Sequence, residues 1–150
     1  MKFGDVVTAV ASLGVVALLI AAVVTAVLVP MNPVLAFGVT GIPSYLVASL
    51  IVGYLFALKI QEESRMGAIG SMVVLFTVVA TVVELAFMAN PLASPAIKEV
   101  LESMYNTSAW TNYNWFVMLW EVVALKIVFA LVLSFIGLYA GSMLRKPKKT

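Results

Sequence analysis

The sequence predicts an all-α integral membrane protein: a bundle of four transmembrane helices with a short amphipathic helix in the outer loop between helices three and four. Hydrophobic residues make up 63% of the 150 residues and charged residues only 11%, with a mean hydropathy of +1.11. Soluble domains carry about 25% charged residues. The apolar runs use most of the chain, so we expect a single polytopic membrane domain over 1–150.

Each of the four apolar runs approaches or exceeds the ~20 residues that a helix needs to cross a bilayer. We expect spans at about 6–29, 42–58, 67–89 and 114–144. The first is too long for the apolar core of a signal peptide, so we interpret it as a retained helix that ends at Pro30. Pro43 falls in the first turn of the second span, where a missing N–H is tolerated. The polar segment 59–65 is expected to be a short connection.

The longest connection, 90–114, is predicted to contain the amphipathic helix. Ser94 and Pro95 resemble an N-cap and a first helical position. Behind them, apolar residues recur at helical spacing on one face: Ile97, Val100, Leu101, Met104 and Tyr105. We expect this helix to lie along the membrane surface or to cap the bundle.

Basic residues predict the orientation of the chain in the membrane. One side carries Lys2, Lys59, Arg65, Arg145, Lys146, Lys148 and Lys149, whereas the other carries only Lys98. By the positive-inside rule, both termini and the 59–66 hairpin are expected in the cytoplasm. The basic tail formed by Arg145, Lys146, Lys148 and Lys149 is expected to favour anionic lipid.

Aromatic residues are concentrated where the fourth span begins. Trp110, Trp115 and Trp120 are typical of an interfacial aromatic belt, but they also suit an outer docking surface for another protein. Asn106 begins an Asn-Thr-Ser tripeptide on the expected outer side, which makes it a possible glycosylation site.

Small residues at four-residue spacing predict how the helices pack, because close backbone approach in membranes needs Gly, Ala or Ser. The second span offers Ser49, Gly53 and Ala57, and the fourth offers Gly137 and Gly141. The first span has two such faces, one with Ala17 and Ala21 and the other with Ala22 and Ala26. They indicate packing within one bundle or, alternatively, docking of a different subunit.

Three ionisable residues interrupt the apolar runs: Glu84, Glu121 and Lys126. A charge at the bilayer centre costs about 3 kcal/mol on insertion scales, so each needs a partner. Thr77 and Thr81 extend Glu84 into a polar stripe on the third span. We expect Glu84 to pair with Lys126. The three charges are consistent with a structural ion pair, a proton or ion route, or, chiefly for Glu121, a contact with another subunit.

Composition argues against most catalytic chemistry. The chain has no Cys and no His, which argues against haem ligation by His, Fe–S clusters and most zinc sites. Without His, its serines cannot form a Ser-His-Asp triad. We therefore expect no enzymatic activity and no cofactor, and the small net charge of +2 indicates no nucleic-acid partner.

Two function classes remain. The first is a non-catalytic integral subunit that packs against and stabilises other integral membrane subunits of a larger complex, for example a respiratory or other energy-transducing assembly. The second is a small oligomeric transporter or proton/ion channel that uses Glu84, Glu121 and Lys126. The length and span count are similar to those of small multidrug transporters. Those proteins carry their membrane Glu in the first helix, where this chain has no acid after Asp5, so no family is assigned.

Overall fold

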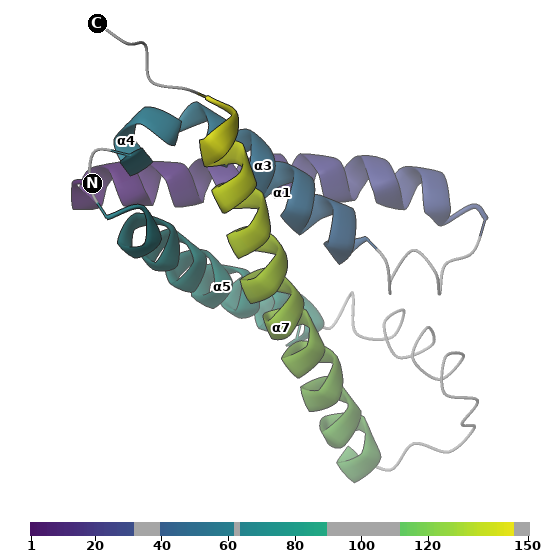
Figure 1. Cartoon of the computed structure of the whole chain (residues 1–150). Coiled ribbons are helices and arrows are strands. Elements are labelled where there is room, and N and C mark those ends of the chain that lie inside the picture. The colour runs from purple at the N-terminus through teal and green to yellow at the C-terminus, as the bar shows by residue number, and fades with distance from the viewer. Residues whose placement is uncertain (32–39, 62–63, 90–111, 146–150) are drawn as a thin grey trace, which may run out of the picture.

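The computed structural model describes residues 1–31, 40–61, 64–89 and 112–145, without the side chains of Gln61, Glu84, 87–89 and 112–122. In these segments the secondary structure is entirely α-helical. The helices are α1 (Phe3–Leu28), α3 (Gly41–Leu55), α4 (Ala57–Gln61), α5 (Arg65–Ala89) and α7 (Asn112–Leu144). Their arrangement is shown in Figure 1.

Three helical stretches are long and apolar enough to cross a membrane: Phe3–Leu28, Arg65–Val83 and Val123–Leu144. The prediction of an all-helical fold is therefore confirmed for the described residues, and three helices of membrane-spanning length support the prediction of a membrane protein. The second expected span is shorter than predicted, because α3 has only 15 residues. At ~1.5 Å per residue it covers ~22 Å, less than a ~30 Å hydrocarbon core.

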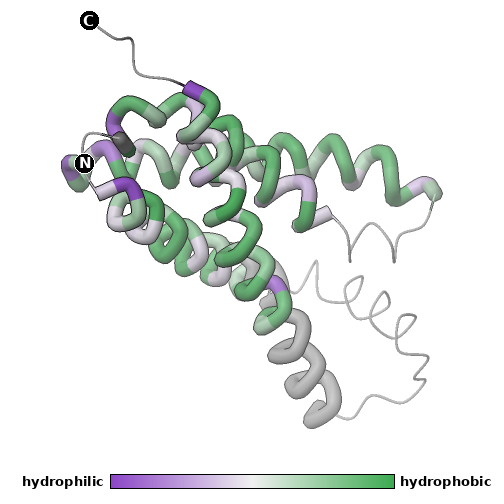
Figure 2. The backbone as a smooth tube through the Cα atoms, in the orientation of Figure 1, coloured by the Kyte–Doolittle hydropathy of each residue, from purple (hydrophilic) through white to green (hydrophobic). Residues whose placement is uncertain are grey.

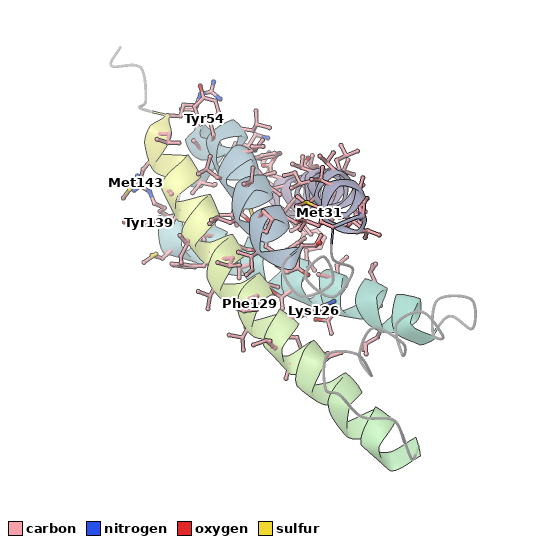
Figure 3. The ribbon with its side chains drawn as sticks, turned by 90° about the vertical axis from the view of Figure 1, so that its right-hand side faces the viewer. Met31, Tyr54, Lys126, Phe129, Tyr139 and Met143 are labelled. Atoms are coloured by element: carbon pink, nitrogen blue, oxygen red, sulfur yellow. The ribbon has the colours of Figure 1, made fainter. Side chains whose placement is uncertain are left out.

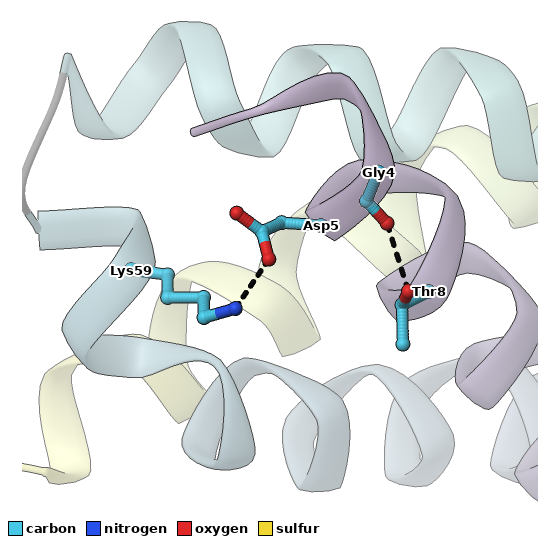
Figure 4. A network of polar contacts seen from close by, with 4 residues as sticks. All are labelled: Gly4, Asp5, Thr8 and Lys59. Carbon is cyan, nitrogen blue, oxygen red and sulfur yellow. Dashed lines mark hydrogen bonds and ion pairs between the residues drawn. The ribbon is translucent and has the colours of Figure 1, made fainter.

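The second span ends early because the chain turns at Phe56, whose φ of −95° and ψ of 7° lie outside the helical region. The turn buries Ala57 and Ile60 completely. It also brings Lys59 of α4 to Asp5 of α1, with which Lys59 forms an ion pair (Figure 4). Residues Lys59 to Gln61, expected in a connecting hairpin, are therefore helical.

Polar residues gather at one end of the molecule, where α1 and α5 begin, α4 lies and α7 ends (Figure 2). We call this the basic end, and its described basic residues are Lys2, Lys59, Arg65 and Arg145. The Arg145 guanidinium lies 5.8 Å from the centre of the Tyr54 ring, a cation–π contact that connects the end of α7 to the end of α3.

The protein core lies toward the basic end. In α1 the buried residues are Val6, Ala9, Val10, Leu13 and Ala17, and none is buried between Ala17 and Leu28. In α5, the last buried side chain among those described is Thr77. Beyond these points α1 and α5 diverge (Figure 1), so their far halves expose apolar side chains that the rest of the described chain does not cover.

Among the described helices, α3 and α7 share the most extensive contact. Glycines allow the two helices to approach this closely. A Cβ atom on Gly53 would lie 2.5 Å from the Leu138 carbonyl oxygen. A Cβ on Gly137 would lie 2.7 Å from the Leu46 carbonyl oxygen, and one on Gly141 would meet the backbone of Leu50. Real Cβ atoms essentially never approach other atoms this closely. The two backbones are therefore in direct contact, and they run parallel, because Leu46 lies at Gly137 and Leu50 at Gly141.

Several expectations fall outside the described residues. They are the amphipathic helix of the 90–114 connection, the glycosylation site at Asn106, Trp110, and the tail residues Lys146, Lys148 and Lys149. The fourth expected span, 114–144, corresponds closely to α7.

The glycine contacts can be tested with two Gly→Ala substitutions that should change the stability of the fold in opposite directions. Gly137→Ala should destabilise the fold by about 1–3 kcal/mol, because the added methyl overpacks the backbone contact. Gly70→Ala is the matched control, because a Cβ there meets nothing within 4 Å. That change should be neutral or stabilise by up to ~1 kcal/mol. Reversible unfolding in mixed micelles measures both, and equal effects would contradict the α3–α7 contact.

Candidate functional site

A polar stripe on α5 is the first candidate site. Thr77 is buried, with 6% of its surface exposed, and Thr81 is half-buried one turn later. The Thr81 hydroxyl donates a 2.8 Å hydrogen bond to the Thr77 carbonyl oxygen. The Thr77 hydroxyl itself has no hydrogen-bond partner among the described residues. The stripe therefore presents a hydrogen-bonding group that its own helix does not satisfy.

Other helical hydroxyls of the protein behave differently. Those of Thr8, Ser44 and Ser71 each donate to the carbonyl oxygen four residues earlier. This local bond is the usual way to satisfy Ser and Thr within a helix. Thr77 and the fully buried Ser134 of α7 depart from it. A buried hydroxyl without a partner costs about 1–3 kcal/mol, so these two positions favour a polar contact.

Lys126 is the charged residue that the structure describes within the apolar length of α7. It is half-buried and lies between two buried residues of the same helix, Val123 and Ala130. In Figure 3 its side chain extends from α7 on the side where α5 passes. The cation thus lies well away from the basic end.

For the two acidic residues of the predicted charge network, the structure describes the backbone and not the side chain. Glu84 lies in the last part of α5 and Glu121 in the first part of α7, and both side chains fall outside the description. The same holds for Trp115 and Trp120, which are in the first three turns of α7. The Glu84–Lys126 pair and the outer docking surface therefore stay predictions.

The predicted packing residues lie at helix contacts. Ser49, Gly53 and Ala57 are buried, as are Gly137 and Gly141 on α7. The Cβ of Ser49 lies 2.6 Å from the ideal Cβ position of Gly137, which places Ser49 directly in the α3–α7 contact.

The two small-residue faces of α1 have different surroundings. Ala17 is buried and Ala21 is half-buried, so this face packs within the chain. Ala22 and Ala26 are exposed and lie in the far half of α1, where no residue is buried. One small-residue face is therefore used internally, and the other remains available for a further helix.

Two features were not anticipated from the sequence. Ser44, Ser134 and Ser142 are buried, and the available signal was their spacing: Ser134 precedes Gly137 by one helical turn and Gly141 by two. The Asp5–Lys59 pair was also missed, although both residues mark the same end of neighbouring apolar runs.

The described residues contain no group of three or more His, Cys, Asp or Glu side chains that could hold a metal ion. Comparisons with protein-family models, curated proteins and solved structures found no significant match to this chain.

The predicted ion pair can be tested by a double-mutant cycle. Lys126→Met and Glu84→Gln are made singly and together, and unfolding free energies are compared. If the side chains touch, the coupling should be about 1 kcal/mol or more, because a lone buried charge is worse than none. The parallel cycle with Glu121→Gln is the control. Additive effects in the Glu84 cycle with coupling in the Glu121 cycle would reassign the partner.

Proposed function

We propose that this protein is a non-catalytic integral subunit of a larger membrane complex, in which it packs against and stabilises partner subunits. A respiratory or other energy-transducing assembly is one example of such a complex. In this proposal the chain has four spans, the second of them built on α3, and both termini lie in the cytoplasm. Its partners are the lipid bilayer and other integral membrane proteins.

The observation that carries this proposal is the uneven burial of residues along α1. All its buried residues lie between Val6 and Ala17, and none lies between Leu18 and Leu28, although α1 packs against both α3 and α5. In this second stretch, the exposed Ala22 and Ala26 are four residues apart, the spacing that lets a second membrane helix approach closely. Beyond Ala17 the chain's own contacts to α1 leave its residues half-buried or exposed, as at Ile20 and at Thr25 beside Thr40, so this part of the helix is suited to a partner subunit. The proposed outer docking surface of Trp110, Trp115 and Trp120 would add aromatic anchors to the same interaction.

Enlarging the open face of α1 tests this assignment. Ala22→Ile with Ala26→Ile should release the protein from a co-purifying partner, because the larger side chains prevent close helix contact. Ala11→Ile is the matched control, since Ala11 is also exposed on α1 but lies in the half that contacts the chain's own core. Native mass measurement after mild detergent extraction gives the composition.

Partner retention by all variants would argue against docking at α1. A wild-type particle that contains only copies of this chain would contradict the subunit proposal.

The orientation is tested by labelling, because the chain contains no Cys. With Ser103→Cys, an impermeant thiol reagent should label intact cells or right-side-out vesicles. With Thr150→Cys, the same reagent should label only after the membrane is opened, because basic residues favour the cytoplasmic side. The reverse pattern would contradict the proposed topology.

A second candidate function is a small oligomeric transporter or proton/ion channel. The buried, unsatisfied Thr77 hydroxyl on the same helix as Glu84 favours it, as does the half-buried Lys126 on the helix in contact. Ionisable residues inside a membrane are functional candidates by default. Proton flux into liposomes containing only this chain, abolished by Lys126→Met, would place transport ahead of the subunit role.

A further inference from the structure

An apolar groove runs between α5 and α7. Its lining consists of Val73 from α5 and Leu131, Val132, Phe135 and Ile136 from α7. Its volume is about 340 Å³, and it is open on one side. Since the lining is apolar, water would find no hydrogen-bond partners there, and the groove suits hydrocarbon.

Exposed methionines lie beyond the groove, toward the basic end, on both helices. Met66 lies two turns from Val73 on α5, and Met143 lies two turns from Ile136 on α7, and both methionines are exposed. Tyr139 and Met143 project from the same side of α7 in Figure 3. Flexible Met side chains adapt to irregular apolar ligands. Exposed apolar side chains therefore occur on both helices between the groove and the basic end.

The depth of the groove corresponds to the acyl-chain region of one leaflet. Eight residues separate Arg65 from Val73 and nine separate Ile136 from Arg145, which places the groove ~12–14 Å from the charged rim. Half of a ~30 Å hydrocarbon core is ~15 Å. An occupant with its polar group at the rim would thus bring an apolar chain of leaflet length into the groove.

The charged residues at the basic end indicate that the polar group of the occupant is negatively charged. Asp5, the acidic side chain that the structure describes at the basic end, is paired with Lys59. Arg65 of α5 begins the same helix as Val73 and forms no ion pair with any described residue. Arg favours phosphate groups, with which it forms charge-assisted hydrogen bonds.

We propose that the α5–α7 groove binds an acyl chain of an anionic phospholipid, whose phosphate lies at Arg65. The distance from the charged rim to the groove suits an acyl chain that is anchored by its phosphate. This site is distinct from the exposed face of α1 and does not depend on the subunit role.

The test compares phosphatidylglycerol with phosphatidylcholine of the same acyl chains, added to the purified full-length protein in detergent. Native mass spectrometry counts the bound lipids. The wild type should retain one phosphatidylglycerol roughly fivefold more tightly than phosphatidylcholine, because both lipids offer a phosphate to Arg65 but the choline cation of phosphatidylcholine is repelled by the basic end. Equal retention of the two lipids would overturn the assignment of the headgroup.

Two pairs of variants locate the lipid. Ile136→Trp fills the groove, and Val128→Trp is its control, because Val128 is equally exposed on α7 but does not line the groove. Arg65→Gln removes the rim charge, and Lys2→Gln is its control at the same end. Only Ile136→Trp and Arg65→Gln should lower phosphatidylglycerol retention, each about tenfold. Thermal unfolding establishes that all four variants are folded.

Two results would overturn the proposal. The first is unchanged retention in both Ile136→Trp and Arg65→Gln, which would place the lipid elsewhere. The second is a co-purifying polypeptide that Ile136→Trp releases while phosphatidylglycerol retention stays unchanged, which would assign the groove to a protein helix.

Discussion

The direct backbone contact between α3 and α7 is the constraint on which the other contacts depend. Gly53, Gly137 and Gly141 remove the side chains that would separate the two helices. Hydrophobic burial contributes little between helices in lipid, so such close packing is a main source of association there. With α7 fixed on α3, the Phe56 turn can bury Ile60, and Lys59 reaches Asp5 of α1.

Because α3 is short, the contact is confined to part of the bilayer's thickness. The core gathers at the basic end, and α1 and α5 extend beyond it with exposed apolar surfaces. In water such surfaces would be unstable, but in a membrane they can face lipid or a neighbouring helix. The proposed subunit role follows from this asymmetry, because the far half of α1 presents its second small-residue face where its own chain does not cover it.

Much of the fold could be predicted from the sequence. Runs of apolar residues predicted α1, α5 and α7 nearly to their ends, since length and composition decide whether a helix can cross a bilayer. The turn at Phe56 could not be predicted, because no Pro or Gly marks it and it depends on the tertiary burial of Ala57 and Ile60. Within the candidate site, the polar stripe through Thr77 was visible from spacing, but its unsatisfied hydroxyl depends on rotamer and neighbours. The chemistry of Glu84 and Glu121 stays a prediction, because helical periodicity gives the face of a residue and not its partner.

The central claim is that the backbones of α3 and α7 touch, and solid-state NMR of the protein in bilayers tests it without changing any side chain. Carbon-13 is placed at the glycine Cα and leucine carbonyl positions, and assigned Gly141 and Leu50 signals are examined for through-space transfer. The structure predicts a short-range cross-peak between the Gly141 Cα and the Leu50 carbonyl carbon, because a Cβ on Gly141 would lie 3.0 Å from that carbon. Absence of this cross-peak, with intrahelical cross-peaks of the same residues present, would contradict the account.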